Sequence, residues 1–208
     1  MGRYNFDKIV DRKHTKSLKY DFAVQRGKPA DVLPFWVADM DFEIPSELKQ
    51  VLLDRVNHGI FGYTESDDAY FNVLKEWFAS RFNWNIDKKW LVKTPGVVFA
   101  LAMAVRSFTK EGEGVLINQP VYYPFSMVID DNDRNLINVP LIQGEDRYTI
   151  DFEGVERAII EHNVTLFLLC NPHNPVGRVW TEDELKRLGD ICIKHNVIII
   201  SDEIHADF

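Results

Sequence analysis

The chain has little cysteine, no long uninterrupted apolar run and no excess of basic side chains. Only two of its 208 residues are cysteine, Cys170 and Cys192, and both lie in apolar stretches, which predicts buried thiols rather than a disulfide scaffold. The formal net charge of −8 argues against nucleic acid or an anionic membrane as a partner. Residues 1–20 carry charges throughout and hold no apolar core of signal-peptide length, so we expect a cytoplasmic protein.

Two common phosphate-binding motifs are also missing. The sequence contains neither G-x-x-x-x-G-K-[ST] nor G-x-G-x-x-G, so neither a nucleotide P-loop nor a dinucleotide fingerprint is supported. There is no internal repeat or low-complexity tract, and the hydrophobic content of 46% is ordinary for a globular protein.

The first part of the chain reads as an irregular arm followed by helices. The arm runs to about Asp31, and an apolar patch covers residues 33–40. A helix follows that Ser46 can cap and Gly59 can end. Over residues 67–82 the apolar side chains recur at intervals of three and four, which predicts a second helix with one buried face.

From Trp90 onward short apolar strands alternate with helices, a pattern that predicts an α/β fold with a largely parallel sheet. Strands are expected near 90–93, 114–118, 135–139, 165–170 and 197–201, and helices near 96–109, 123–131, 152–162 and 182–195. The last two strands have no polar alternation, so we expect both of their faces to be covered. Thr181 and Glu184 have the spacing of a capping box at the start of the last helix.

Polar residues follow both of these apolar strands, at the sheet edge where ligands bind in open parallel sheets. In the segment 171–177 two Asn-Pro steps restrict the backbone and hold Asn174 at a fixed angle, so its amide could face a ligand. The alternative is a stiff connector without a ligand. Asp202 comes after four apolar residues and Ser201, and a desolvated carboxylate there needs a positive partner such as a protonated ring nitrogen. The alternatives are a helix cap or an ion pair with an arginine.

Three weaker features accompany them. Gly96, Val97 and Val98 begin an apolar helix whose free backbone N–H groups suit a phosphate. Tyr122 follows a short strand and could stack on a flat heteroaromatic ring, although such aromatics are more often packing residues. The same alternative applies to Tyr63, which lies in a turn that looks exposed.

Together these pieces resemble the fold type I pyridoxal phosphate (PLP) enzymes, the aminotransferase class I/II superfamily, and within it the MalY/PatB-type cystathionine β-lyase branch. Four motifs carry the resemblance, at residues 36–42, 120–125, 171–180 and 201–207. It implies an aspartate-aminotransferase-like fold, with residues 1–60 as an N-terminal arm and part of the small domain. Residues 61–208 would then be the N-terminal portion of a large PLP-binding domain, incomplete at its C-terminus.

The resemblance also implies roles for individual residues. Asp202 would partner the pyridine nitrogen, Asn174 the phenolic oxygen, and Tyr122 would stack on the ring, while Gly96, Val97 and Val98 would bind the phosphate. Tyr63 would reach the phosphate of a neighbouring subunit in a homodimer, and Trp36 and Ala38 would lie near the carboxylate of an amino-acid substrate. His205 stands where many relatives carry a tyrosine, which leaves its role less defined.

The implied reaction is β-elimination from cystathionine or a cysteine conjugate, giving a thiol, pyruvate and ammonia. The family's Schiff-base lysine lies beyond the position of Phe208, so this chain is expected to be an N-terminal fragment that is inactive alone. Lys194 precedes the strand at 197–201 and therefore belongs to the opposite edge. Two other readings stay open, a PLP-dependent aminotransferase and a non-catalytic interaction module that keeps the fold.

Overall fold

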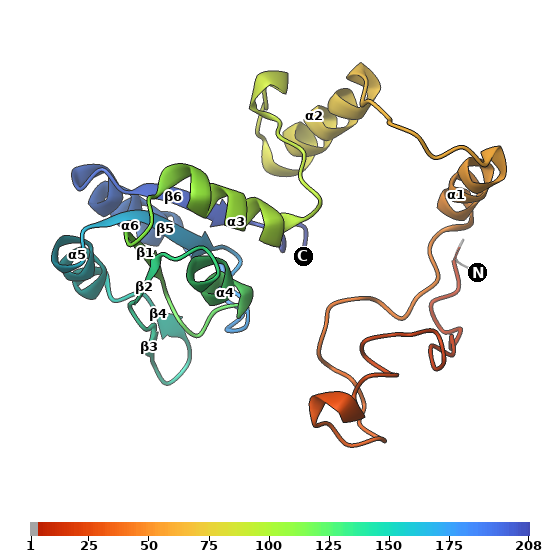
Figure 1. The fold of residues 1–208 in the computed structure, drawn as a ribbon, viewed down its shortest axis with the longest axis horizontal. Helices are drawn as coiled ribbons and strands as arrows, with labels where there is room; N and C mark the ends of the chain where they lie inside the picture. The colour runs from red at the N-terminus through yellow and green to blue at the C-terminus, as the bar shows by residue number, and fades with distance from the viewer. Residues whose placement is uncertain (1–3) are drawn as a thin grey trace. The chain divides into compact units, whose positions relative to one another are not determined.

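The computed structural model describes residues 4–208, and Met1–Arg3 of the predicted arm lie outside this range. The chain divides into two compact units, Met1–Trp84 and Asn85–Phe208 (Figure 1). The second unit contains the strands and most of the buried apolar side chains of the described chain. None of the helices described in residues 4–208 is long and apolar enough to cross a membrane.

The second unit is built on a four-stranded parallel sheet. In spatial order its strands are β2 (Asn135–Asn138), β1 (Gly114–Ile117), β5 (Val164–Cys170) and β6 (Ile198–Asp202). The predicted parallel sheet is therefore confirmed. Parallel strands need crossover connections, and helices supply them here.

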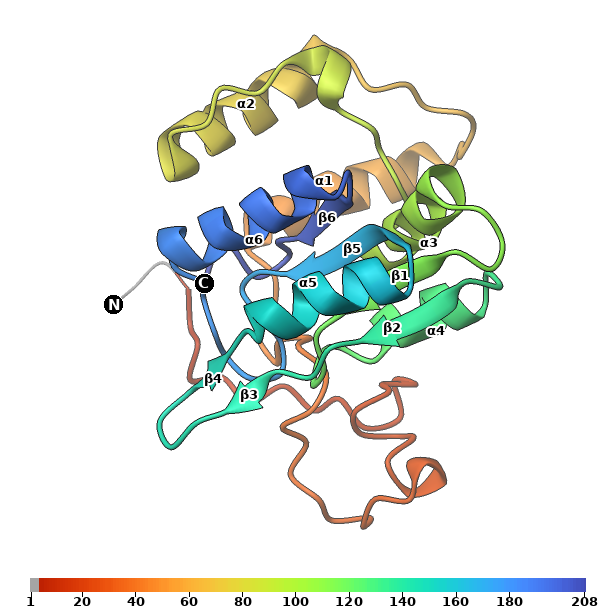
Figure 2. The same ribbon diagram turned by 90° about the vertical axis from the view of Figure 1, so that its left-hand side faces the viewer.

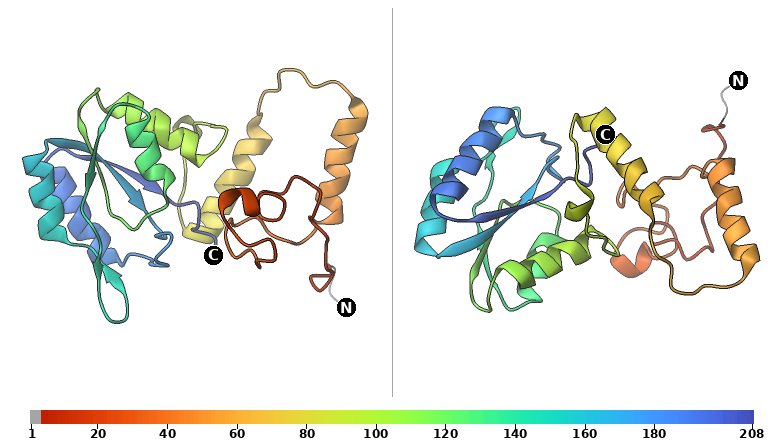
Figure 3. Two further views of the ribbon diagram at one scale, coloured as in Figure 1. Left: turned by 60° about the horizontal axis from the view of Figure 1, so that its bottom comes forward. Right: turned by 90° about the horizontal axis from the view of Figure 1, so that it is seen from above.

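Helices cover both faces of this sheet (Figure 2). On one face lie α3 (Val97–Phe108) and α4 (Pro124–Asp130), and on the other lie α5 (Phe152–Glu161) and α6 (Glu182–Lys194). Successive side chains of β5 alternate between the two layers: Leu166, Leu168 and Cys170 pack in the α3/α4 core, whereas Phe167 and Leu169 pack in the α5/α6 core. The three layers are also visible from two further directions in Figure 3.

The four helices of this unit match the predicted ranges to within one or two residues, and the capping box between Thr181 and Glu184 is present. The strand predicted at 90–93 is wrong. Residues Lys88–Trp90 form a short 3₁₀ helix, η2, because the Asp87 side chain accepts a hydrogen bond from the Lys89 N–H. An antiparallel pair, β3 (Ile142–Gln143) and β4 (Tyr148–Thr149), was not predicted because each strand has only two residues.

The expectation that both faces of the last strand are covered is also wrong. β6 is an edge strand of the sheet, and Ile198 keeps 41% of its surface exposed. By contrast, β5 lies between β1 and β6 and is buried along nearly its whole length. An apolar run without alternation therefore predicted the burial of β5 correctly. The same pattern cannot tell a central strand from an edge strand such as β6.

The first unit contains a 3₁₀ helix, η1 (Val24–Arg26), and the helices α1 (Ser46–His58) and α2 (Asp68–Phe82). Gly59 ends α1 as predicted, in a left-handed conformation with φ of 74°. Ser46 does not cap α1: Pro45 holds the N-cap position, and the Ser46 hydroxyl donates to the Glu47 carboxylate at 3.1 Å.

The predicted buried face of α2 is not buried. Tyr70, Val73 and Trp77 are 45%, 66% and 47% exposed. Within residues 4–208, the first unit contributes only Ala23 to the buried apolar residues. The helix predicted from the periodicity is therefore present, but none of its residues is fully buried: Phe78 packs against Phe82 and Trp84, and the helix buries no continuous apolar face.

Candidate cofactor site

The carboxyl ends of β5 and β6 bring the two strongest sequence candidates to the same edge of the sheet. Cys170, the last residue of β5, is the register partner of Asp202, the last residue of β6. The ladder continues one step further, because the Asn171 N–H donates to the Asp202 carbonyl oxygen at 2.9 Å. The loop that carries Asn174 therefore starts directly beside Asp202.

Asp202 is a buried carboxylate without a cationic partner. It is 6% exposed, and its Oδ1 accepts a hydrogen bond from the Ile204 N–H at 3.1 Å. Among residues 4–208 no Lys, Arg or His nitrogen lies within ion-pair distance of it. Burial raises the pKa of the Asp202 carboxyl above its ordinary value, while the Ile204 N–H and the charge of His205 oppose that rise. The carboxylate can thus receive a cation from outside the described chain.

The Asn174 side chain is half-buried. The Asn174 backbone N–H donates to the Cys170 sulfur at 3.5 Å, and the loop contains the cis peptide bonds Asn171-Pro172 and Asn174-Pro175. No hydrogen bond of the Asn174 side-chain amide occurs within the described range. The amide is therefore free to bind a ligand.

Tyr122 comes from the carboxyl end of the neighbouring strand β1 through the segment 118–122. Asn118 anchors the start of this segment, because its Nδ2 donates to the Val139 carbonyl at 2.8 Å. The pKa of the Tyr122 hydroxyl is raised, first by partial burial and then by Tyr123 and the negative charge of Asp202. Tyr122 thus lies within electrostatic reach of Asp202, and its ring remains 38% exposed.

Gly96, Val97 and Val98 form the N-terminus of α3. Gly96 is the N-cap, with φ of 152°, and no side chain of the described residues caps the helix there. Because α3 leads directly into β1, it runs antiparallel to the strands and its first turn lies at their carboxyl edge. The free N–H groups of that turn are suited to an anion.

His205 lies in the turn that follows β6. Its ring is half-buried, 6.4 Å from the ring of Phe208, and its charge lowers the pKa of Asp202. The second unit thus brings together Gly96, Val97, Val98, Tyr122, Asn174, Asp202 and His205 from the carboxyl ends of three strands and the start of one helix.

The three remaining candidates belong to the first unit. Trp36 is half-buried beneath the Arg26 guanidinium, 5.8 Å from its ring centre, and its Nε1 is buried without a hydrogen-bond partner in residues 4–208. Ala38 is exposed, and Tyr63 is fully exposed. Their proposed roles toward a substrate or a second subunit stay predictions.

Residues that support the candidate loop were not singled out from the sequence. His173 and Arg178 are buried, and Trp180 packs between them, 5.4 Å from the His173 ring and 4.7 Å from the Arg178 guanidinium. Arg178 also pairs with Glu184 at 2.6 Å. In the sequence, the signal that this loop is packed rather than solvated was the presence of two polar side chains, His173 and Arg178, shortly after a buried strand.

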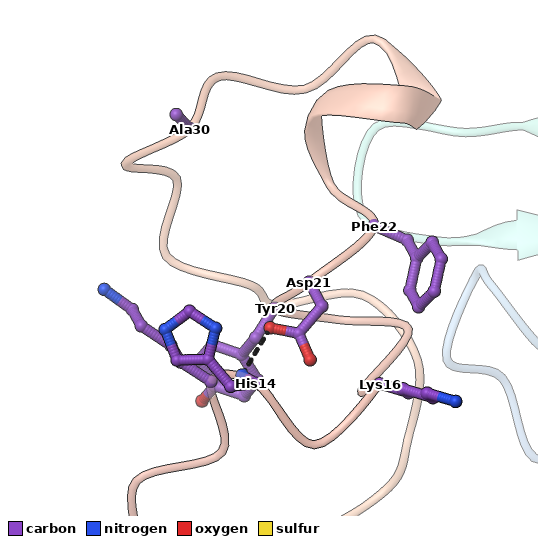
Figure 4. Close-up of a pocket in the computed structure, with 7 residues that line it drawn as sticks. His14, Lys16, Tyr20, Asp21, Phe22 and Ala30 are labelled. Carbon is purple, nitrogen blue, oxygen red and sulfur yellow. Dashed lines mark hydrogen bonds between the residues drawn. The ribbon is translucent and has the colours of Figure 1, made fainter.

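A hollow of about 570 Å³ lies elsewhere, in the first unit (Figure 4). It is lined by Lys13, His14, Lys16, Tyr20, Asp21, Phe22 and Ala30. The His14 N–H donates to the Asp21 carboxylate at 2.8 Å across it. None of the predicted site residues lines this hollow, and most of its side chains are exposed, so it is not the candidate site.

Comparison with known proteins identifies the family. Residues 30–208 match the family described as aminotransferase class I and II, and the chain belongs to this family. Its sheet and flanking helices are those of an aspartate-aminotransferase-like fold.

The similar proteins include a cystathionine beta-lyase and a protein solved with PLP. The chain is 43% identical over 203 residues to the cystathionine beta-lyase PatB of Bacillus subtilis, a match that covers 98% of the chain and 52% of PatB. It is 36% identical to the protein MalY of Escherichia coli, covering 98% of the chain and 53% of MalY. The crystal structure of cystalysin from Treponema denticola, which contains PLP, superimposes with a TM-score of 0.90 at 41% identity, over 98% of the chain and 52% of cystalysin. The chain thus spans about half the length of the relatives it matches.

Proposed function

We propose that the carboxyl edge of the second unit holds PLP in the complete protein, and that this protein is a carbon-sulfur β-lyase. The observation that carries the proposal is the Asp202 carboxylate, which is 6% exposed and has no cationic nitrogen within ion-pair distance in residues 4–208. A buried carboxylate is costly unless something positive faces it. A protonated pyridine nitrogen meets that need.

The other residues fit the remaining parts of PLP. Asn174 has a side-chain amide without a partner in the described chain and would donate to the phenolic oxygen. Tyr122 would stack on the ring, and the N–H groups at Gly96, Val97 and Val98 would bind the phosphate. His205 would lie on the phenolic side.

When bound, PLP supplies an electron-withdrawing ring that allows an amino acid to lose its α-proton. Asp202 would support this chemistry, because its negative charge would keep the pyridine nitrogen of the ring protonated. Asn174 and Tyr122 would fix the orientation of the ring. The substrate class is cystathionine or a cysteine conjugate, because PatB is a cystathionine beta-lyase and the chain is 43% identical to it.

The proposal also gives roles to three residues near the N-terminus and includes a homodimer. Trp36 and Ala38 would lie near the substrate carboxylate, and the exposed Tyr63 would reach the phosphate bound by a second copy of the chain. We further propose that residues 1–60 belong to the arm and small domain, that residues 61–208 belong to the large domain, and that the protein is cytoplasmic.

Amino transfer is the second candidate, and the family itself supports it, since it is described as aminotransferase class I and II. The same contacts to the ring serve both reactions. Incubating the full-length protein with cystathionine separates them. Stoichiometric pyruvate without a keto-acid acceptor supports elimination, and strict dependence on an acceptor would instead support transfer.

A further inference from the structure

His173 joins the two segments that carry Asn174 and Tyr122. It is 3% exposed, and its Nε2 lies 3.0 Å from the carbonyl oxygen of Pro120, a residue 53 positions earlier in the chain. Asn174 directly follows His173, and Tyr122 lies two residues after Pro120. One hydrogen bond therefore connects the loop after β5 to the segment after β1.

The backbone of His173 is fixed within its own loop. The His173 N–H donates to the Arg178 carbonyl at 2.6 Å, and its carbonyl accepts from the Gly177 N–H at 2.9 Å. Trp180 packs edge-on against the imidazole and donates from its Nε1 to the Cys170 carbonyl at 3.0 Å. The ring therefore has little freedom to leave Pro120.

The chemistry of the contact determines the form of the imidazole. A carbonyl oxygen only accepts, so Nε2 carries the proton and donates to Pro120. Nδ1 is buried without a hydrogen-bond partner in residues 4–208, so a second N–H there would have no acceptor at hydrogen-bond distance. The Arg178 guanidinium lies against Trp180, which packs on the His173 ring, and it is already paired with Glu184. Burial also lowers the pKa of His173 below its ordinary value.

We infer that His173 is a positioning residue whose Nε2–H bond to Pro120 sets the separation between Asn174 and Tyr122, and so the geometry in which the cofactor ring is held. This inference rests on the proposed function. His173 does not touch the ring itself in this account. Its effect passes through the two segments that it connects.

Hydrogen exchange of the 208-residue chain tests the connection without any cofactor. The informative variants are His173→Leu, which removes the donor, and His173→Gln, whose amide N–H can reach the same carbonyl. Ile159→Ala, in the α5 core, is the matched control for a general loss of stability. A hydrogen bond of this kind corresponds to roughly a tenfold change in an opening equilibrium.

For His173→Leu we expect about tenfold faster exchange in both 118–126 and 171–180, with His173→Gln close to wild type. Ile159→Ala should change exchange across the whole unit in proportion to its stability. If His173→Leu accelerates exchange only in 171–180, or if His173→Gln behaves like His173→Leu, the inference is wrong.

A titration of the cofactor-free full-length protein with PLP, followed by absorbance, provides the second measurement. We expect His173→Leu to bind PLP about tenfold more weakly than wild type and His173→Gln to recover most of the affinity. Equal affinity in all three would overturn the positioning role. If wild type itself does not bind, the proposed function fails, and the exchange experiment still decides whether His173 connects the two segments.

Discussion

The Asn171 N–H donates to the carbonyl oxygen of Asp202 at 2.9 Å, one step beyond the register pair Cys170 and Asp202. The loop with the free amide and the strand with the unpaired carboxylate are therefore joined by the sheet ladder itself. This connection makes the edge of the sheet a rigid base for a ligand, and the predictions below start from it.

Replacing Asp202 with Asn should stabilise the chain at pH 7 when no cofactor is present. Asn keeps the oxygen that accepts from Ile204 and removes a buried, unpaired charge, for which we expect a gain of about 0.5–2 kcal/mol in the free energy of unfolding. Chemical denaturation of both proteins measures it. The same variant should bind PLP more weakly, because the pyridine nitrogen loses its counter-charge.

The pH dependence of this gain has a definite sign. Because the pKa of Asp202 is raised in the folded state from the ordinary value of 3.8, the folded protein holds a proton that the unfolded chain has lost between these two pKa values. The wild-type carboxylate therefore costs nothing well below pH 3.8, progressively more between pH 3.8 and the folded-state pKa, and a constant amount above the folded-state pKa. The advantage of Asp202→Asn should grow with pH across that interval and then level off, and an advantage that shrinks with rising pH, or is already complete below pH 3.8, would contradict it.

Asn174→Ala should leave stability nearly unchanged and weaken the binding of PLP. The side-chain amide has no partner in the described chain, so its loss removes no hydrogen bond of the folded protein. A lost contact to the phenolic oxygen should lower affinity about tenfold or more. Thermal unfolding and an absorbance titration measure the two effects. A large loss of stability with unchanged affinity would assign Asn174 a structural role.

Tyr122→Phe should retain the affinity for PLP, and Tyr122→Ala should reduce it. Stacking depends on the ring face, which Phe keeps, and an aromatic pair contributes about 0.5–1.5 kcal/mol beyond its buried area. The comparison separates stacking from a role of the hydroxyl. Equal weakening by both variants would show that the hydroxyl is the contact that matters.

Arg178→Ala should destabilise the chain by about 3–5 kcal/mol, because it leaves the partly buried Glu184 without its cation and removes a side chain that packs on Trp180. Glu184→Gln tests the pair from the other side while the side chain still reaches the backbone N–H of Thr181. Thr181→Ala removes only the cap and should cost about 1 kcal/mol. Urea denaturation of the three variants ranks these effects, and an Arg178→Ala cost no larger than that of Thr181→Ala would refute a stabilising pair.

The sequence predicted the second unit well because its elements are determined locally. In Val164–Cys170 every residue except Thr165 is apolar, and α6 carries its own capping box. The exposure of α2 and β6 could not be predicted in this way. An apolar periodicity shows that a surface needs covering, but the residues that cover it need not lie in the same described chain.

The polar candidates could be identified from their place after buried strands, and the structure brings Asn174 and Asp202 to one sheet edge. The contacts that hold the two segments together could not be predicted. The bond from His173 to Pro120 spans 53 positions, and no local pattern encodes such a contact. Trp36, Ala38 and Tyr63 belong to the other unit, so their roles still depend on the family resemblance.

The most direct test of this account is a crystal structure of the protein with PLP bound. The account predicts that an Asp202 carboxylate oxygen lies about 2.8 Å from the pyridine nitrogen, as in a charge-assisted hydrogen bond, with the Asn174 amide on the opposite side of the ring. A ring bound away from this edge, or bound here with its nitrogen turned away from Asp202, would contradict it.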